Sequence, residues 1–349
     1  MKEVPADAVE TAPGDGPMPD EGRAVGRRSG AMRTSVERVG LLMALAAVVI
    51  FFSILKPSEF LTASNFAAIL GSQAVLVVLT CALLIPLTVG DYDLSIASTL
   101  LLSQMLIGIL NTRHGVPIGL LIPICLLTGA AIGFVNGGFI ILFGIDSLIV
   151  TLGVGTFVSG IVLLISNSET FSGISESLTN LVVVDRLFGI PLEFYYGLLV
   201  VIIMWYVFEY TTLGRRLLFV GRGRNVARLS GLRVNRIRWG SFVASGVIAA
   251  GAGILYAGTT GAADPTSGAN YLLPAFAAAF LGTTAFFPGR FNPWGSFVAV
   301  YFLVTGVTGL ALFGLQSWVQ DMFYGGALVL AVTLSQIARR REALVTGAG

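Results

Sequence analysis

The sequence contains little charge, one histidine and two cysteines, and each shortage excludes a class of protein. Asp, Glu, Lys and Arg make up 11% of the 349 residues, whereas about 25% is usual in globular domains. A soluble chain so poor in charge could not cover its surface, which excludes a soluble enzyme, a coiled coil and a disordered chain. The residues AVILMFWYC reach 55%, and lipid is the solvent that suits them. The composition therefore predicts a membrane protein.

The few histidines and cysteines also restrict the metal sites and catalytic sites that the chain can form. His114 is the single histidine, which excludes the HExxH zinc motif. Cys81 and Cys125 lie in apolar runs without a CxxC spacing, so we interpret them as small apolar residues of membrane helices. The motifs GxxxxGK[ST] and GxSxG are both absent, so the sequence offers neither a phosphate-binding loop nor a nucleophilic serine. We predict no catalytic residue, no metal site and no cofactor bound by this chain.

What the sequence does contain is a series of apolar stretches. Residues 1–38, rich in Pro, Gly and charge, are predicted to form a disordered cytoplasmic tail. A membrane helix needs about 20 apolar residues, and ten stretches approach this length. They cover residues 39–55, 67–89, 94–111, 116–136, 147–166, 194–209, 239–257, 272–287, 294–313 and 319–338.

These stretches predict an all-α polytopic membrane protein with about ten transmembrane helices. Eight or nine remain open, because the charge-free run 115–145 is long for one crossing and 272–287 is short. The transmembrane domain is predicted over 39–338 and a cytoplasmic C-terminal tail over 339–349.

The basic residues predict the orientation. With a cytoplasmic N-terminus, 18 of the 21 basic residues fall on the cytoplasmic side, and Lys56, Arg113 and Arg186 lie outside. Such an excess is the usual sign of cytoplasmic loops, so both termini are predicted to be cytoplasmic in a multi-pass protein of the plasma membrane. The second to fifth and the seventh to tenth helices then have opposite orientations, which is the arrangement of an inverted repeat.

Acidic residues within the predicted helices lie near their ends. Proton-coupled carriers usually place an ionisable group in mid-membrane, so this distribution disfavours an ion-coupled carrier without excluding it. If the protein is a pump, we expect another subunit to supply the energy.

Four polar residues are candidates to line a pathway through the membrane. Asp93 and Ser95 follow Gly90 in the segment GDYDLS, where they either cap a helix or line a polar pathway. Asn136 and Thr151 lie in apolar helices, and a buried amide in lipid must find partners. Each is therefore either a structural hydrogen-bonding group or a pathway residue. Gly129 and Gly133, four residues apart, favour close helix packing.

A second candidate segment covers residues 264–289. Pro265 and Gly268 predict an outward-facing turn, and Asn270 and Tyr271 begin a short Ala-rich helix that Gly282 interrupts. The segment is either a broken helix of the kind that forms transporter sites or an external loop followed by a short packing helix.

The most basic segment is the loop 211–238, which holds eight arginines. Residues 225–230 are predicted to form a short amphipathic helix, capped by Asn225 and ended by a left-handed Gly231. This helix would dock on a cytoplasmic partner. The alternative is a positive loop that lies on anionic lipid. The candidate docking residues are Arg224, Asn225, Ala227, Arg228, Ser230, Gly231 and Arg233.

Five motifs in order carry a resemblance to a known family over about residues 60–338. They are Asp93-Leu94-Ser95, Asn136-Gly137, the VTLG of 150–153, the NVARLSG of 225–231 and the GANY of 268–271. With these motifs the chain resembles the membrane permease subunit of bacterial ABC importers for sugars, of the ribose/xylose type, which is related to branched-chain amino-acid permeases.

The resemblance implies several partners. Two permease subunits, identical or different, would form the pathway in the lipid bilayer, two cytoplasmic ATPase subunits would hold ATP and Mg, and an extracytoplasmic binding protein would deliver the solute. The 225–231 segment would be the coupling helix, and no nucleic acid is expected. Val226 and the stretch 286–290 depart from the family pattern, which leaves the solute open. A branched-chain amino-acid permease, an ion-coupled carrier and a membrane scaffold are the alternatives.

Overall fold

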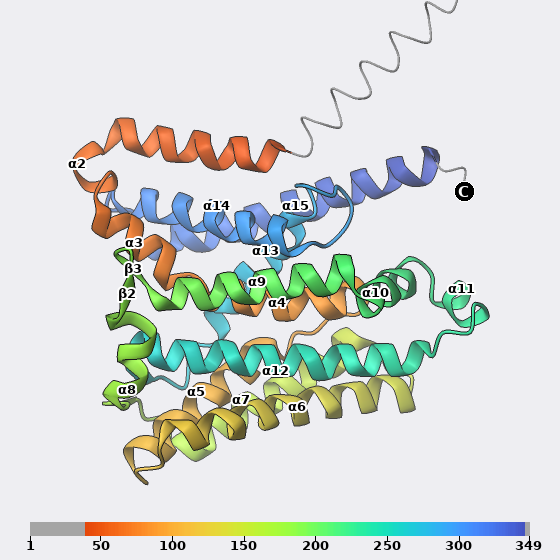
Figure 1. Ribbon diagram of the computed structural model, residues 1–349, viewed down its shortest axis with the longest axis horizontal. Coiled ribbons are helices and arrows are strands. Elements are labelled where there is room, and N and C mark those ends of the chain that lie inside the picture. The colour runs from red at the N-terminus through yellow and green to blue at the C-terminus, as the bar shows by residue number, and fades with distance from the viewer. Residues whose placement is uncertain (1–38, 346–349) are drawn as a thin grey trace, which may run out of the picture. The chain divides into compact units, whose positions relative to one another are not determined.

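The computed structural model describes residues 39–345, a set of long helices that run side by side (Figure 1). The predicted tail 1–38 and residues 346–349 lie outside the described residues. An unlabelled helix covers Val39–Leu55. The other elements are α2 (Pro57–Phe60), α3 (Ala63–Ser72), α4 (Ala74–Thr88), α5 (Ile96–Thr112), α6 (Ile118–Leu142), α7 (Ser147–Ser166), β1 (Phe171–Ser172), α8 (Glu176–Thr179), the π-helix η1 (Asn180–Val184), β2 (Arg186–Leu187), β3 (Ile190–Pro191), α9 (Leu192–Tyr210), α10 (Thr212–Arg222), α11 (Arg224–Leu229), α12 (Val234–Thr260), β4 (Ala262–Ala263), α13 (Ala269–Gly282), α14 (Pro293–Ala311) and α15 (Ser317–Val345).

The helices confirm the all-α polytopic prediction. Within the described residues, six helical segments are long and apolar enough to cross a membrane, and three further apolar helices are shorter. Each of the ten predicted stretches coincides with a helix. The run 115–145 forms one 25-residue helix, α6, and the chain from Ala63 to Thr88 is broken at Gln73 into α3 and α4. Helix α15 continues to Val345, so residues 339–345 extend a helix that was expected to end at 338.

Helix α4 lies at the centre of the fold because it is apolar on every side. All 15 of its residues are buried, and α9, α12, α13 and α14 pack around it. An all-round apolar helix is typical of such a position. Helices α6 and α7 instead expose large apolar side chains, among them Leu127, Phe157 and Leu164, as expected for surfaces that contact lipid.

Glycines set the closest helix contact. A Cβ atom on Gly129 of α6 would meet the backbone oxygen of Gly246 on α12, and a Cβ on Gly246 would meet the backbone oxygen of Gly129. A Cβ on Gly133 would likewise meet the backbone of Phe242. Small residues let helix backbones approach closely in lipid, so Gly129 and Gly133 have the packing role that their spacing indicates.

The two predicted halves have corresponding neighbours. Helix α5 packs against α6 and α7, and α13 packs against α14 and α15; helix α12 packs against α5 and α6, and α4 packs against α13 and α14. Exchanging the two sets of four helices thus preserves these contacts, as an inverted repeat requires, although α4 also packs against α5 and the described residues show no comparable packing of α12 against α13.

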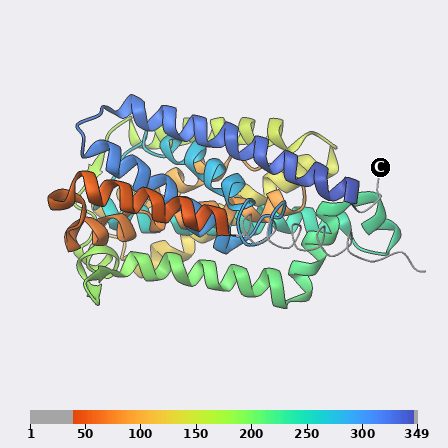
Figure 2. The same cartoon turned by 90° about the horizontal axis from the view of Figure 1, so that it is seen from above.

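The helix bundle has two distinct ends. Helices α10 and α11 and the end of α15 lie at one end, which we call the arginine-rich end (Figures 1 and 2). Helices α2 and α8 lie at the opposite end, together with two short antiparallel strand pairs, β1 with β4 and β2 with β3. Lys56, Arg113 and Arg186 belong to this opposite end, so within residues 39–345 the basic residues separate as the sequence predicts.

Candidate functional site

The predicted docking helix is α11 (Figure 1). It covers Arg224–Leu229, and Gly223 rather than Asn225 occupies the N-cap position. The prediction that Asn225 caps the helix is therefore wrong: the helix starts one residue before Asn225, which lies exposed in its first turn. Gly231 has a φ of +81°, so the predicted left-handed end is confirmed.

One face of this docking helix is exposed and apolar. Leu229 is 89% exposed and Val226 is 58% exposed, while Ala227 on the opposite face is fully buried. Arg228, Ser230 and Arg233 are exposed beside them. Exposed large apolar side chains next to a charged surface are typical of sites that bind another protein or a membrane.

A buried carboxylate fastens the docking helix to the rest of the protein. Asp91 is 2% exposed, and its Oδ1 accepts a hydrogen bond from Arg224 Nη2 at 2.9 Å. Arg238 of α12 binds both oxygens of the same carboxylate through Nε and Nη2, at 2.7 and 2.8 Å. Arg224 also donates to the backbone oxygen of Gly90 at 2.7 Å. We call Asp91, Arg224 and Arg238 the Asp91 clamp. The bidentate contact of Arg238 with the carboxylate is stronger than a single hydrogen bond between the same groups.

Next to the clamp lies a buried polar cluster formed by Asp93, Ser95, Asn136 and Ser245. Asp93 Oδ1 accepts from the hydroxyl of Ser95 at 2.6 Å, and Oδ2 accepts from the hydroxyl of Ser245 at 2.8 Å. Asn136 Nδ2 donates to Ser95 Oγ at 2.8 Å. Asn136 Oδ1 has no partner among the described residues.

The segment 92–94 is also held by α7. The backbone N–H of Leu94 donates to the hydroxyl of Thr151 at 3.0 Å, and that of Tyr92 donates to Ser147 Oγ at 3.0 Å. The structure thus brings Asp93, Ser95, Asn136 and Thr151 together, although 58 residues separate the first from the last. Segment 91–95 connects the docking helix with α6, α7 and α12.

Asn270 and Tyr271 lie elsewhere, at the start of α13 near the opposite end. Asn270 is exposed, and Tyr271 packs edge-on against Tyr256 with ring centroids 5.0 Å apart. The preceding turn is closed by Asp264, which accepts from the hydroxyl and the backbone N–H of Thr266 at 2.7 Å each. These hydrogen bonds hold the pKa of Asp264 below its usual value.

Five buried or clamp-forming polar residues escaped the sequence analysis: Asp91 of the clamp and the four that follow. Glu193, in the first turn of α9, is 2% exposed and accepts from Thr259 at 2.6 Å. Gln104 is buried and donates to the backbone oxygen of Ala262 at 3.0 Å. Ser245 and Arg238 both lie on α12. A serine four residues after Ser241 was a detectable sign of a polar face, but no local pattern links Glu193 to a partner 66 residues away.

The described residues contain no group of three or more His, Cys, Asp or Glu side chains that could hold a metal ion. The described site consists of three parts: the exposed helix α11, the Asp91 clamp that holds it, and the buried hydrogen-bonded cluster between α5, α6 and α12.

Several helices of membrane length around a buried polar cluster define a polytopic membrane protein. Residues 65–332 match the family described as branched-chain amino acid transport system / permease component, and the chain belongs to this family. The resemblance seen in the motifs is thereby confirmed. A permease component is one part of a transport system, so the chain works with other components. Its several helices of membrane length make it a multi-pass membrane protein.

Curated relatives are about 30% identical to the chain over their aligned parts. It is 30% identical to the D-allose transport system permease protein AlsC of Escherichia coli K12 over 86% of this chain and 92% of that protein. It is also 30% identical to the autoinducer 2 import system permease protein LsrD of Photorhabdus luminescens, over 71% and 77%. LsrD of Yersinia pseudotuberculosis is 30% identical over 74% and 80%. No solved structure matches the chain.

Proposed function

We propose that this chain forms the translocation pathway of an ATP-driven importer for a sugar or sugar-like solute. A binding protein delivers the solute at the opposite end, and ATPase subunits that hold ATP and Mg dock at the arginine-rich end. A second permease subunit, identical or different, completes the pathway.

One observation carries this proposal: the exposed docking helix is fastened to the buried polar cluster. Arg224, the first residue of α11, binds Asp91, and Asp93 two residues later binds Ser245. Arg238 and Ser245 are seven residues apart on α12, about two helical turns, so one face of α12 holds both carboxyls. A push on α11 by an ATPase would therefore move segment 91–95 and α12 together.

That movement would also affect Asn136 and Thr151. Asn136 of α6 and Thr151 of α7 each make one hydrogen bond to segment 94–95. A shift of this segment would break or exchange these bonds, which is how we propose that ATP binding changes the pathway between its two open states.

The proposed solute follows from the relatives, whose names specify D-allose and autoinducer 2. A branched-chain amino acid is the second candidate, because the family description names it. An ion-coupled carrier is the third. The chain should be reconstituted with its ATPase and binding protein, and the uptake of labelled D-allose, autoinducer 2 and leucine measured. We expect ATP-dependent uptake of a sugar-like solute. Uptake that follows an ion gradient without ATP, or of leucine alone, would contradict the proposal.

The exposed face of α11 gives a prediction about assembly. Exchanging Arg228 for Glu and Leu229 for Ser should weaken association with the ATPase at least about tenfold, because centrally placed contact residues contribute about 2 kcal/mol or more. Membrane insertion should be unchanged, since both side chains are exposed. Co-purification of the ATPase in mild detergent measures the effect. Arg186→Glu, an exposed arginine at the opposite end, is the control. Normal assembly and uptake of the double variant would refute the docking assignment.

A further inference from the structure

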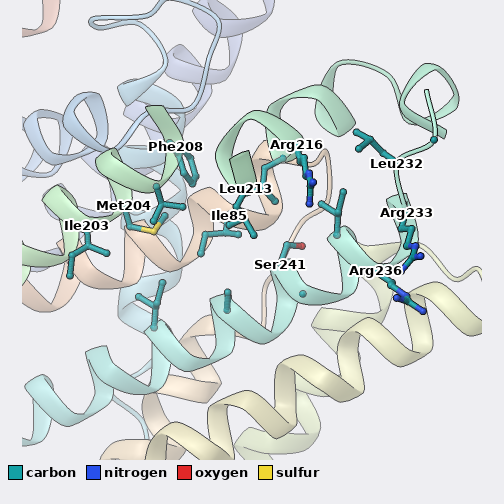
Figure 3. Close-up of a pocket in the computed structure, with 17 residues that line it drawn as sticks. Ile85, Ile203, Met204, Phe208, Leu213, Arg216, Leu232, Arg233, Arg236 and Ser241 are labelled. Carbon is teal, nitrogen blue, oxygen red and sulfur yellow. The ribbon is translucent and has the colours of Figure 1, made fainter. Parts of the chain in front are cut away.

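A groove of about 730 Å³ lies where α9, α10 and α12 meet beside α4 (Figure 3). Its volume falls within the range of about 300–1,000 Å³ that is usual for small-molecule sites. The groove is separate from the polar cluster: Asp93, Ser95, Asn136 and Thr151 are not among the residues that line it.

Positive charge is concentrated at one end of the groove. Arg233 and Arg236 lie next to each other at that end, Arg216 lies between them and Leu213, and Ile203 lies at the other end (Figure 3). Their guanidinium groups make no ion pair with the described residues, and none of the 17 lining residues is acidic. Glu209, which follows Phe208 in α9, is bound by Arg290 at 2.6 Å. The three arginines are thus free to bind an anion.

The rest of the groove is apolar and opens sideways. Met204, Phe208 and Leu217 are buried in its floor, whereas Ile203 is 51% and Leu213 is 57% exposed at its rim. Ile203 and Met204 belong to α9, which is long and apolar enough to cross a membrane, so we expect the Ile203 side of the rim to contact lipid.

The length of the groove matches one leaflet. Arg236 and Ile248 line its two ends on α12 and are twelve residues apart, which corresponds to about 18 Å of helix. Half of a hydrocarbon core about 30 Å thick is about 15 Å. With the arginines at the level of the headgroups, the far end of the groove lies near the middle of the bilayer.

We propose that this groove binds an anionic phospholipid of the cytoplasmic leaflet. Arg216 and Arg236 would hold the phosphate, Arg233 would add positive charge between this site and the docking helix, and an acyl chain would lie along the apolar walls. Basic pockets between membrane helices on the cytoplasmic side favour such headgroups. An acidic surface of the ATPase could pair with the arginines, but no cytosolic protein would fill the apolar part between α9 and α12. The orientation assumed here is the one that the arginine distribution predicts.

The test uses the full-length chain purified with its ATPase from bilayers of phosphatidylcholine and phosphatidylglycerol. Native mass spectrometry counts the phosphatidylglycerol that remains bound. Exchanging Arg216 and Arg236 for Gln should weaken its retention about 30-fold, because each basic side chain near the membrane surface contributes a similar share of the binding free energy to an anionic lipid. Arg215→Gln with Arg222→Gln is the matched control, because both lie exposed on α10 outside the groove and the same charge is removed.

A second variant tests the apolar part. Ala244→Phe fills the groove without changing any charge, and it should also lower phosphatidylglycerol retention; a site for free phosphate alone would not respond. The proposal is overturned if the control pair lowers retention as much, if phosphatidylcholine is retained equally well, or if the Arg216 and Arg236 variant loses the ATPase while it keeps its lipid.

Discussion

Replacing Asp91 with Asn is expected to reduce ATP-driven uptake more than tenfold and to destabilise the protein by about 3 kcal/mol. The carboxylate is 2% exposed and is shared by Arg224 and Arg238. Without it, two guanidinium groups lose their counter-ion, and the docking helix loses its connection to segment 91–95. Breaking a buried ion pair costs about 3–5 kcal/mol. We expect the lower end of this range because the side chains of Arg224 and Arg238 are 38% and 15% exposed. Solute uptake and the thermal unfolding midpoint in detergent measure both effects.

A second ion pair provides the control for Asp91. Glu169→Gln breaks the exposed pair with Arg113 at 2.7 Å, which should cost less than about 1 kcal/mol and leave uptake unchanged. A double variant of Asp91→Asn with Arg224→Gln should transport no worse than Asp91→Asn alone, because the two residues act through one contact. Additive losses, or normal uptake by Asp91→Asn, would show that the clamp does not couple the docking helix to the cluster.

Exchanging Gly246 for Ala is expected to destabilise the packing of α6 against α12. The added Cβ would meet the backbone oxygen of Gly129, which cannot turn aside as a flexible side chain can. Overpacking costs about 1–3 kcal/mol, and we expect the upper end because backbone must move. The thermal unfolding midpoint and the yield of folded protein in detergent report the loss.

Gly251 of the same helix is the matched control for Gly246. A Cβ at Gly251 meets nothing within 4 Å, so Gly251→Ala should leave stability unchanged or raise it by up to about 1 kcal/mol through helix propensity. Equal unfolding midpoints for the two variants would mean that the close approach of α6 and α12 does not determine stability.

The fold was largely predictable because its signals are local. Apolar runs of membrane length gave the ten long apolar stretches, and the glycines at 129 and 133 gave a packing face; the basic helix α10 and the short helices α2 and α8 were not predicted. The candidate residues Asp93, Ser95, Asn136 and Thr151 were singled out as polar groups in apolar surroundings, which must find partners in lipid. Which partners they find could not be predicted, because Ser245 lies 152 residues from Asp93.

The cap of the docking helix shows the same limit at short range. Asn225 is a favourable N-cap residue, yet Gly223 takes that position because the helix begins at Arg224. This earlier start places Arg224 where its guanidinium reaches Asp91, so a tertiary contact outweighs a local preference.

By itself the sequence determined that this chain resides in lipid, where its long apolar helices lie and which end is basic, because hydropathy and charge act on each segment separately. Only the tertiary structure decided that Asp91 joins Arg224 and Arg238, more than 130 residues away, and that three other arginines border an apolar groove. Those arrangements depend on how α4, α9, α10 and α12 pack, and no property of a single segment contains that information.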